Sequence, residues 1–86
     1  MAKQIANRGV IKPVSIRCEI CNGQAMYQEW IEPGFDNNYH RYGIIFCQEC
    51  EHKTKIHRER TPEETRNECI YEWKQRNEAI IRHRKK

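Results

Sequence analysis

The chain has 86 residues, a formal net charge of +4 and an apolar fraction of 37%, and it contains no leucine. This length allows one domain, and the apolar fraction lies below the usual value of about 45–50%, which leaves a thin core. No stretch approaches the length of a membrane-spanning helix, and the mildly basic charge permits nucleic-acid binding without requiring it. We therefore expect a small domain that a metal, a disulfide or a partner stabilises.

Residues 1–17 carry scattered basic side chains among isoleucine and valine, and Gly9 and Pro13 interrupt any helix. The pattern fits a mobile N-terminal arm or a short edge strand, and a third interpretation is a segment that a partner orders. Because residues 1–5 are polar and mixed, we expect no signal peptide and a cytoplasmic location, which is the bacterial host cytoplasm if a phage encodes the chain.

Residues 18–60 are predicted to form a β region with a Cys-x-x-Cys turn at each end of a hairpin. The first turn, at 18–23, ends in Asn22 and Gly23, which both tolerate a positive φ. Aromatic and β-branched residues predict a strand over 24–31, turn formers predict a loop over 32–40, and 41–46 form the return strand. The second turn follows at 47–50, and 53–58 alternate as a third short strand would.

Residues 61–82 are predicted to form an amphipathic helix that packs on the β region. Thr61 is the expected N-cap, with Pro62 at the first helical position and Glu64 completing a capping box. One face carries Cys69, Trp73 and Ile80, with Ile70 and Ile81 beside it, and the solvated face carries Arg66, Glu72, Lys74, Gln75 and Glu78. Residues 83–86 form a basic tail.

The two Cys-x-x-Cys turns predict a metal site formed by Cys18, Cys21, Cys47 and Cys50. A reducing compartment favours metal binding over disulfides, and an odd cysteine count argues against a closed disulfide framework. Four thiolates suit one structural Zn²⁺ and leave no open coordination position. A redox dithiol pair and an iron–sulfur cluster are the alternatives, because four cysteines alone do not select the metal.

Other residues with metal-binding or packing chemistry have simpler interpretations. The fifth cysteine, Cys69, is expected in the core, while His52 and His57 are candidates to replace or supplement a ligand. Trp73 is the expected anchor of the helix on the hairpin, and Arg76 is expected to pair with a carboxylate or carbonyl near the turns.

Three segments resemble the restriction alleviation (Lar-like) family of small phage and prophage zinc proteins. Residues 18–25, Cys-Glu-Ile-Cys-Asn-Gly-Gln-Ala, are similar to that family's opening Cys-Pro-x-Cys-Gly-Gly-x-Ala. Residues 44–50 resemble its second turn at a strand end, and 68–76 resemble its closing helix, Glu-Ala-x-x-x-Trp-Asn-x-Arg. The sequence departs from the family at Glu19, Asn22, Glu51 and Lys74, and the loop between the turns is long.

The resemblance implies a small α+β zinc-stabilised domain that interferes with a host defence enzyme by protein binding. The fold is then a zinc-ribbon-like antiparallel hairpin or three-stranded sheet followed by one long C-terminal helix. The expected partner is a restriction–modification subunit or another host machine such as RNA polymerase. Candidate partner-binding residues are the loop aromatics and the basic tail: Phe35, Tyr39, Tyr42, Arg82, Arg84, Lys85 and Lys86.

Two other function classes remain open. A nucleic-acid-binding zinc ribbon in transcription regulation or host takeover would use the basic residues on phosphates and stack bases on Tyr39, Tyr42 and Trp30, although acidic residues are interleaved throughout. A His-Asn-His nuclease would need His52 or His57 as its base, with Asn67 or Asn77 among its partners. The sequence lacks a phosphate-binding glycine loop and a nucleophile motif, so we expect no enzyme and no small-molecule substrate.

Overall fold

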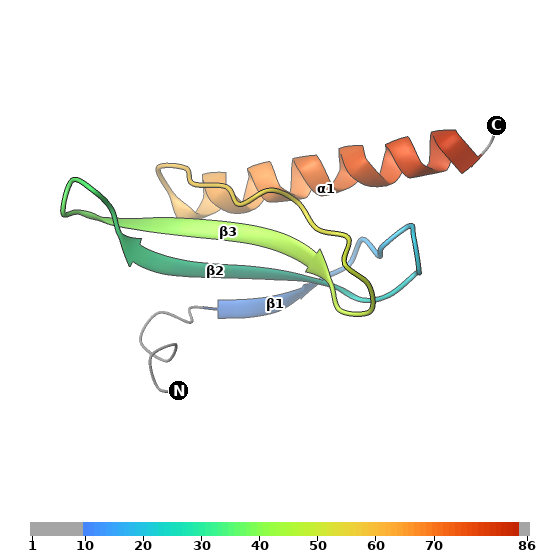
Figure 1. Ribbon diagram of the computed structural model, residues 1–86, viewed down its shortest axis with the longest axis horizontal. Coiled ribbons are helices and arrows are strands. Elements are labelled where there is room, and N and C mark those ends of the chain that lie inside the picture. The colour runs from blue at the N-terminus through green and yellow to red at the C-terminus, as the bar shows by residue number, and fades with distance from the viewer. Residues whose placement is uncertain (1–9, 85–86) are drawn as a thin grey trace.

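The computed structural model describes residues 10–84, which form one antiparallel sheet and one helix (Figure 1). The strands are β1 (Val10–Val14), β2 (Ala25–Pro33) and β3 (Tyr39–Cys47), in the order β1-β2-β3, and the helix is α1 (Pro62–Arg84). The helix lies along one face of the sheet and contacts β3. The predicted three-stranded sheet followed by one C-terminal helix is therefore confirmed.

The hairpin strands are longer than predicted and their connection is shorter. The register runs from the pair Ala25 and Cys47 to the pair Pro33 and Tyr39, so the predicted 32–40 loop shrinks to residues 34–38. Within that tip the Gly34 amide donates to the Asn38 carbonyl over 2.8 Å, and Asn37 adopts a φ of 65°. A tight turn closed by its own hydrogen bonds lets the flanking residues pair as strands.

The third strand is not the one predicted from the alternation at 53–58. The edge strand β1 pairs with β2, whereas 53–58 makes two isolated bridges to β3, at Lys53 and His57. Between these bridges the Lys55 amide turns away from β3 and donates to the Glu72 carboxylate on α1. The segment divides its backbone hydrogen bonds between sheet and helix and forms no regular ladder. Of the predicted arm, residues 1–9 lie outside the described part of the chain.

Trp73 anchors α1 on the sheet, as the sequence predicted. Its side chain is fully buried, its ring lies 4.7 Å from the His52 ring, and its indole N–H donates to the Ile16 carbonyl over 2.9 Å. The residues around it come from both strands of the hairpin and both cysteine turns. The buried core consists of Cys18, Ala25, Tyr27, Ile45, Cys47, Cys69 and Trp73.

The buried line of α1 contains more polar residues than the predicted apolar stripe. It runs through Thr65, Cys69, Trp73 and Asn77 at four-residue spacing, whereas Ile80 is half-buried. Thr65 meets the sheet where β3 carries Gly43, and a Cβ at that glycine would lie 2.7 Å from the Thr65 methyl group. A glycine in β3 is therefore what allows the first turn of the helix to approach the sheet closely.

The ends of α1 follow from its terminal residues. Thr61 accepts a hydrogen bond from the Glu64 amide at 3.0 Å, which confirms the predicted N-cap. The helix continues to Arg84, beyond the predicted end at 82, and the basic residues of its last turn complement the helix dipole. No helix between residues 10 and 84 is both long and apolar enough to cross a membrane.

Glu72 does not lie on a solvated face, as its position in the sequence suggested. Its carboxylate accepts hydrogen bonds from His57 Nε2 (2.7 Å), Arg76 Nε (2.5 Å) and the Lys55 amide (3.2 Å), and its side chain is 18% exposed. Burial alone would raise its pKa, but the bonds from His57 and Arg76 outweigh burial and lower it. The carboxylate thus attaches the 53–58 segment to α1. Arg76 pairs with a carboxylate one turn earlier on its own helix, and not with a group of the cysteine turns.

Replacing Glu72 by glutamine is expected to lower the free energy of unfolding at pH 7 by about 1–3 kcal/mol, because three donors lose a charged acceptor. Since folding lowers the pKa of this carboxyl, its stabilisation is present above its ordinary pKa of 4.5 and is lost as the pH falls through the lower folded-state value. The part of the difference that comes from the ionised Glu72 carboxylate should therefore shrink as the pH falls below about 4.5.

Denaturant unfolding in matched zinc buffers measures this difference. Glu68→Gln is the control, since Glu68 is exposed one turn earlier on the same helix. Equal losses in both variants would show that Glu72 acts only through net charge.

Candidate metal centre

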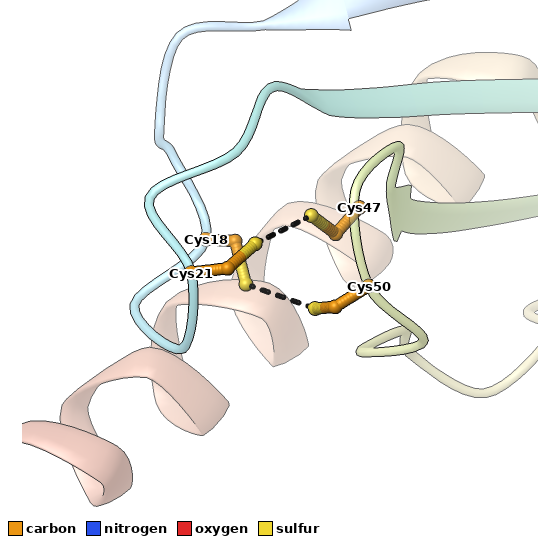
Figure 2. A group of neighbouring side chains, drawn as sticks. All are labelled: Cys18, Cys21, Cys47 and Cys50. Carbon is orange, nitrogen blue, oxygen red and sulfur yellow. Dashed lines mark hydrogen bonds between the residues drawn. The ribbon is translucent and has the colours of Figure 1, made fainter.

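The two cysteine turns meet at the end of the sheet opposite the hairpin tip (Figures 1 and 2). Cys18 and Cys21 lie on the loop that joins β1 to β2, and Cys47 ends β3, with Cys50 in the turn that follows. The antiparallel pairing places the first residue of β2 opposite the last residue of β3, so strand register brings the two turns together. The hairpin thereby brings the sulfur atoms of the first turn next to those of the second turn, although Cys21 and Cys47 are 26 residues apart in sequence and Cys18 and Cys50 are 32 residues apart.

The four sulfur atoms have the spacing of one tetrahedral metal site. All lie within 4.8 Å of one another, with 3.7 Å between Cys18 and Cys50 and 3.4 Å between Cys21 and Cys47. Four ligands about 2.3 Å from a zinc ion would be separated by about 3.8 Å, whereas a disulfide needs about 2.05 Å. The side chains fit a single ion. The cysteine ligands of an iron–sulfur cluster are divided among two or more iron atoms, whereas these four sulfur atoms can all surround one ion.

Backbone amides in both turns point at sulfur atoms. The Ile20 amide lies 3.4 Å from the Cys18 sulfur, and the Glu49 amide lies 3.3 Å from the Cys47 sulfur. Burial opposes the thiolate of Cys47, but the amides of Glu49 and Cys50 favour it and lower its pKa to about 7. Hydrogen bonds from these amides stabilise a negative charge on the Cys47 sulfur, whereas the neighbouring Cys47 sulfur raises the pKa of the Cys21 thiol to about 12. The thiolate is therefore favoured first at Cys47.

Asn22 and Gly23 have different roles in the first turn. Asn22 takes the left-handed conformation, with a φ of 62°, and its amide closes the turn onto the Cys18 carbonyl at 2.8 Å. Gly23 is needed for space: a Cβ there would lie 2.4 Å from the Glu49 side chain and 2.9 Å from the Cys47 sulfur. Asn22 therefore supplies the left-handed residue of this turn, and Gly23 lets the two turns touch.

The two histidines suggested as ligands lie elsewhere. His57 is bound to Glu72 through Nε2. The His52 ring lies against the Trp73 ring at an interplanar angle of 33°, and its buried Nε2 lacks a hydrogen-bond partner. Cys69 is fully buried in the core, where burial raises the pKa of its thiol to about 12. This placement confirms the expected core role of Cys69.

Asn77 supports the first cysteine turn from the helix. Its amide group donates to the Arg17 carbonyl at 3.3 Å and accepts from the Glu19 amide at 3.2 Å. Arg84 also reaches this turn and donates to the Glu19 carbonyl. Sequence reasoning missed this contact, although a buried-face asparagine at four-residue spacing from Trp73 was the available signal. Asn67, the other proposed nuclease residue, is exposed at the opposite end of the helix.

The predicted partner-binding residues fall into separate groups. Phe35 and Tyr39 lie at the hairpin tip with 110% and 73% exposure, whereas Tyr42 stacks on Trp30 with ring centres 5.8 Å apart. Arg82 and Arg84 are exposed near the end of α1, on the side of the metal centre. The structure therefore does not gather the proposed residues into one surface. Lys85 and Lys86 lie outside the described residues.

Comparison with known proteins does not extend this description, since no protein-family model, no curated protein and no solved structure matches the chain.

Proposed function

We propose that this protein is a non-enzymatic binding module in which one structural zinc ion holds a scaffold that presents the hairpin tip to a larger protein. Four cysteine ligands fill a tetrahedral coordination sphere, so a bound ion would have no position left for water or substrate. The ion would contribute stability and fix the geometry of the two turns. Cys18, Cys21, Cys47 and Cys50 are the residues that would hold it.

The observation that carries the binding role is the exposure of Phe35 on a turn that its own hydrogen bonds close. The turn is closed by the bond from Gly34 to Asn38 and by Asp36, whose Oδ1 accepts from the Asn38 amide at 3.1 Å and lies 3.0 Å from His40 Nε2. The hydrogen bond to His40 is the main cause that lowers the pKa of Asp36, to about 2. A fixed backbone that leaves an aromatic ring in solvent suits insertion into an apolar pocket of a partner.

The partner in this proposal is a host defence protein, most specifically a subunit of a restriction–modification enzyme. The three short segments that resemble the restriction alleviation family support this choice of partner. The same resemblance is the basis for proposing a phage origin and an anti-restriction role. Host RNA polymerase and direct nucleic-acid binding are the competing targets. Binding without chemistry would agree with a saturated metal site.

The Phe35→Ala variant tests the interface. Tagged, zinc-loaded protein is mixed with a purified type I restriction–modification complex in nuclease-treated buffer, and the retained complex is quantified. Removing a fully exposed ring leaves folding unaffected, so zinc content and unfolding midpoint should match wild type. Retention of the complex should fall by about ten-fold or more if the ring is a central contact.

A matched control is Tyr71→Ala, since Tyr71 is exposed to 62% on α1, away from the hairpin tip. Equal retention by wild type and Phe35→Ala would remove the tip from the interface. If wild type does not retain the complex but binds duplex or single-stranded DNA with a steep salt dependence, the nucleic-acid alternative would replace the proposal.

A further inference from the structure

A groove of about 540 Å³ lies beside the hairpin, where the sheet extends past the start of α1. One wall comes from the ends of β2 and β3, on the face that α1 covers farther along the sheet. The other wall comes from the segment that leads into the helix. The residues used in the argument below are Ile31, Tyr39, Arg41, Arg58, Arg60 and Pro62.

The groove carries more positive than negative charge. Arg41 is already bound to Glu29, with 2.8 Å between Nη1 and Oε2. Arg58 and Arg60 are exposed and form no ion pair with any residue from 10 to 84. Glu59 is the single acidic side chain among the lining residues. Two guanidinium groups in the groove therefore remain available for a ligand.

The wall formed by β2 and β3 carries two apolar side chains that are open to solvent, beside Arg41 and His40. Ile31 is 40% exposed and Tyr39 is 73% exposed, although most large apolar side chains of the hairpin are at least half-buried. A guanidinium group binds a carboxylate through two parallel hydrogen bonds, and an apolar wall nearby adds contact area for a neighbouring side chain. The lining matches a ligand that combines carboxylates with an apolar group.

We propose that this groove binds a short acidic segment of the partner protein, with carboxylates on Arg58 and Arg60 and an apolar side chain against Ile31 and Tyr39. The inference rests on the proposed protein-binding role. Tyr39 begins the strand that follows the tip carrying Phe35, so one partner can contact both the tip and the groove.

The surroundings of the groove favour a peptide over a nucleic-acid strand. Arg60 also borders an adjoining hollow whose other lining residues include Glu59, Glu64 and Glu68. A polyanion that continued past Arg60 would meet Glu64 and Glu68 in addition to Glu59, and like charges repel. A short acidic segment can end before it reaches Glu64 and Glu68.

The test is a nuclear magnetic resonance titration of the nitrogen-labelled, zinc-loaded full chain. The probe is the peptide acetyl-Asp-Glu-Phe-Glu-Asp-amide, and its control carries asparagine and glutamine in place of the four acids. Saturable shifts are expected at Arg58, Arg60 and Tyr39, and the acidic peptide should bind about ten-fold or more tightly than its control.

Two variants with equal change in net charge locate the effect. Arg58→Gln with Arg60→Gln should weaken peptide binding by about ten-fold, and Lys53→Gln with Lys55→Gln should leave it within about two-fold. Equal weakening in both, or no saturable shift with the acidic peptide, would overturn the proposal. Tighter binding of a single-stranded oligothymidylate at the same residues would assign the groove to nucleic acid instead.

The result is separable from the test of the hairpin tip. Phe35→Ala should bind the acidic peptide as wild type does, because Phe35 does not line the groove. If the acidic peptide does not bind, the groove proposal is wrong, but capture of the restriction–modification complex through Phe35 is unaffected. If the complex is not captured, the proposed function is wrong, but the peptide titration still decides whether the groove binds an acidic segment.

Discussion

Cys47→Ser is expected to abolish stoichiometric metal binding and cooperative folding together at neutral pH. Serine does not ionise in this range and leaves three thiolates around the site. Cys47 is also the last residue of β3 and part of the buried core, so the loss affects the ligand set and the packing at one position. Circular dichroism and metal analysis of the same purified sample measure both effects.

The expected loss of stability on losing the metal ion is large because the chain has a thin core. Binding of structural zinc in small domains is worth on the order of 10–16 kcal/mol at pH 7, and the whole stability of a typical domain is about 5–15 kcal/mol. With an apolar fraction of 37% and 7 residues in its buried core, this chain has little stability to spare. Removing the ion from wild type with a chelator should unfold it for the same reason.

Cys69→Ala provides the matched control, since Cys69 is a buried cysteine outside the cluster. It should keep one metal ion per chain and lose only about 1 kcal/mol of stability. A Cys47→Ser protein that remains folded and cooperative without metal would contradict the structural role of the ion.

Trp73→Ala is expected to lower the free energy of unfolding by about 3–5 kcal/mol, the usual cost of removing a large aromatic residue from a core. The indole is fully buried, packs against the His52 ring and bonds the Ile16 carbonyl, so its loss detaches the helix from both the sheet and the segment before Cys18. Denaturant titration in zinc-saturated buffer, followed by circular dichroism, measures the change.

Tyr71→Ala is the control for Trp73, because its ring is 62% exposed on the same helix. Its effect should stay within about 0.5 kcal/mol. Trp73→Phe should recover part of the loss while leaving the Ile16 carbonyl without its indole donor. Equal stability of wild type and Trp73→Ala would show that the helix is attached elsewhere, for example through Glu72.

The hairpin, the cysteine cluster and the helix could be predicted because each depends on local chemistry. Cysteine spacing defines a metal turn, aromatic and β-branched residues indicate the hairpin strands, and Thr61 followed by Pro62 marks the helix start. The expected core positions of Cys69 and Trp73 follow from the same helical periodicity. These signals lie within a few residues of the structures that they specify.

Features that depend on contacts between distant segments could not be read in the same way. Glu72 was predicted to be solvated because its hydrogen-bond partners, His57 and Lys55, belong to another segment that only the fold brings close to it. Asn77 is buried and accepts a hydrogen bond from the Glu19 amide. The periodicity of α1 does not indicate which residue of another segment an asparagine at this position contacts. The alternation at 53–58 predicted a third strand, whereas Val10–Val14 completes the sheet and bears out the edge strand that was one interpretation of residues 1–17.

The metal site could be identified from sequence, and the metal and the partner could not. Cysteine residues accept several thiophilic ions, and their choice depends on affinity and supply as well as geometry. The proposed binding groove is lined by Arg58, Arg60 and Tyr39, which lie far apart in the sequence and line one hollow only in the folded chain. The short segments that resemble restriction alleviation proteins carry no information about such a groove.

X-ray absorption at the zinc edge of the purified, metal-loaded full chain tests the central claim most directly. The account predicts one zinc ion per chain surrounded by four sulfur atoms at about 2.3 Å, with no nitrogen or oxygen in the coordination shell. A shell in which nitrogen or oxygen replaces one sulfur would contradict the closed cysteine site and would return His52 or a bound water to consideration as a ligand.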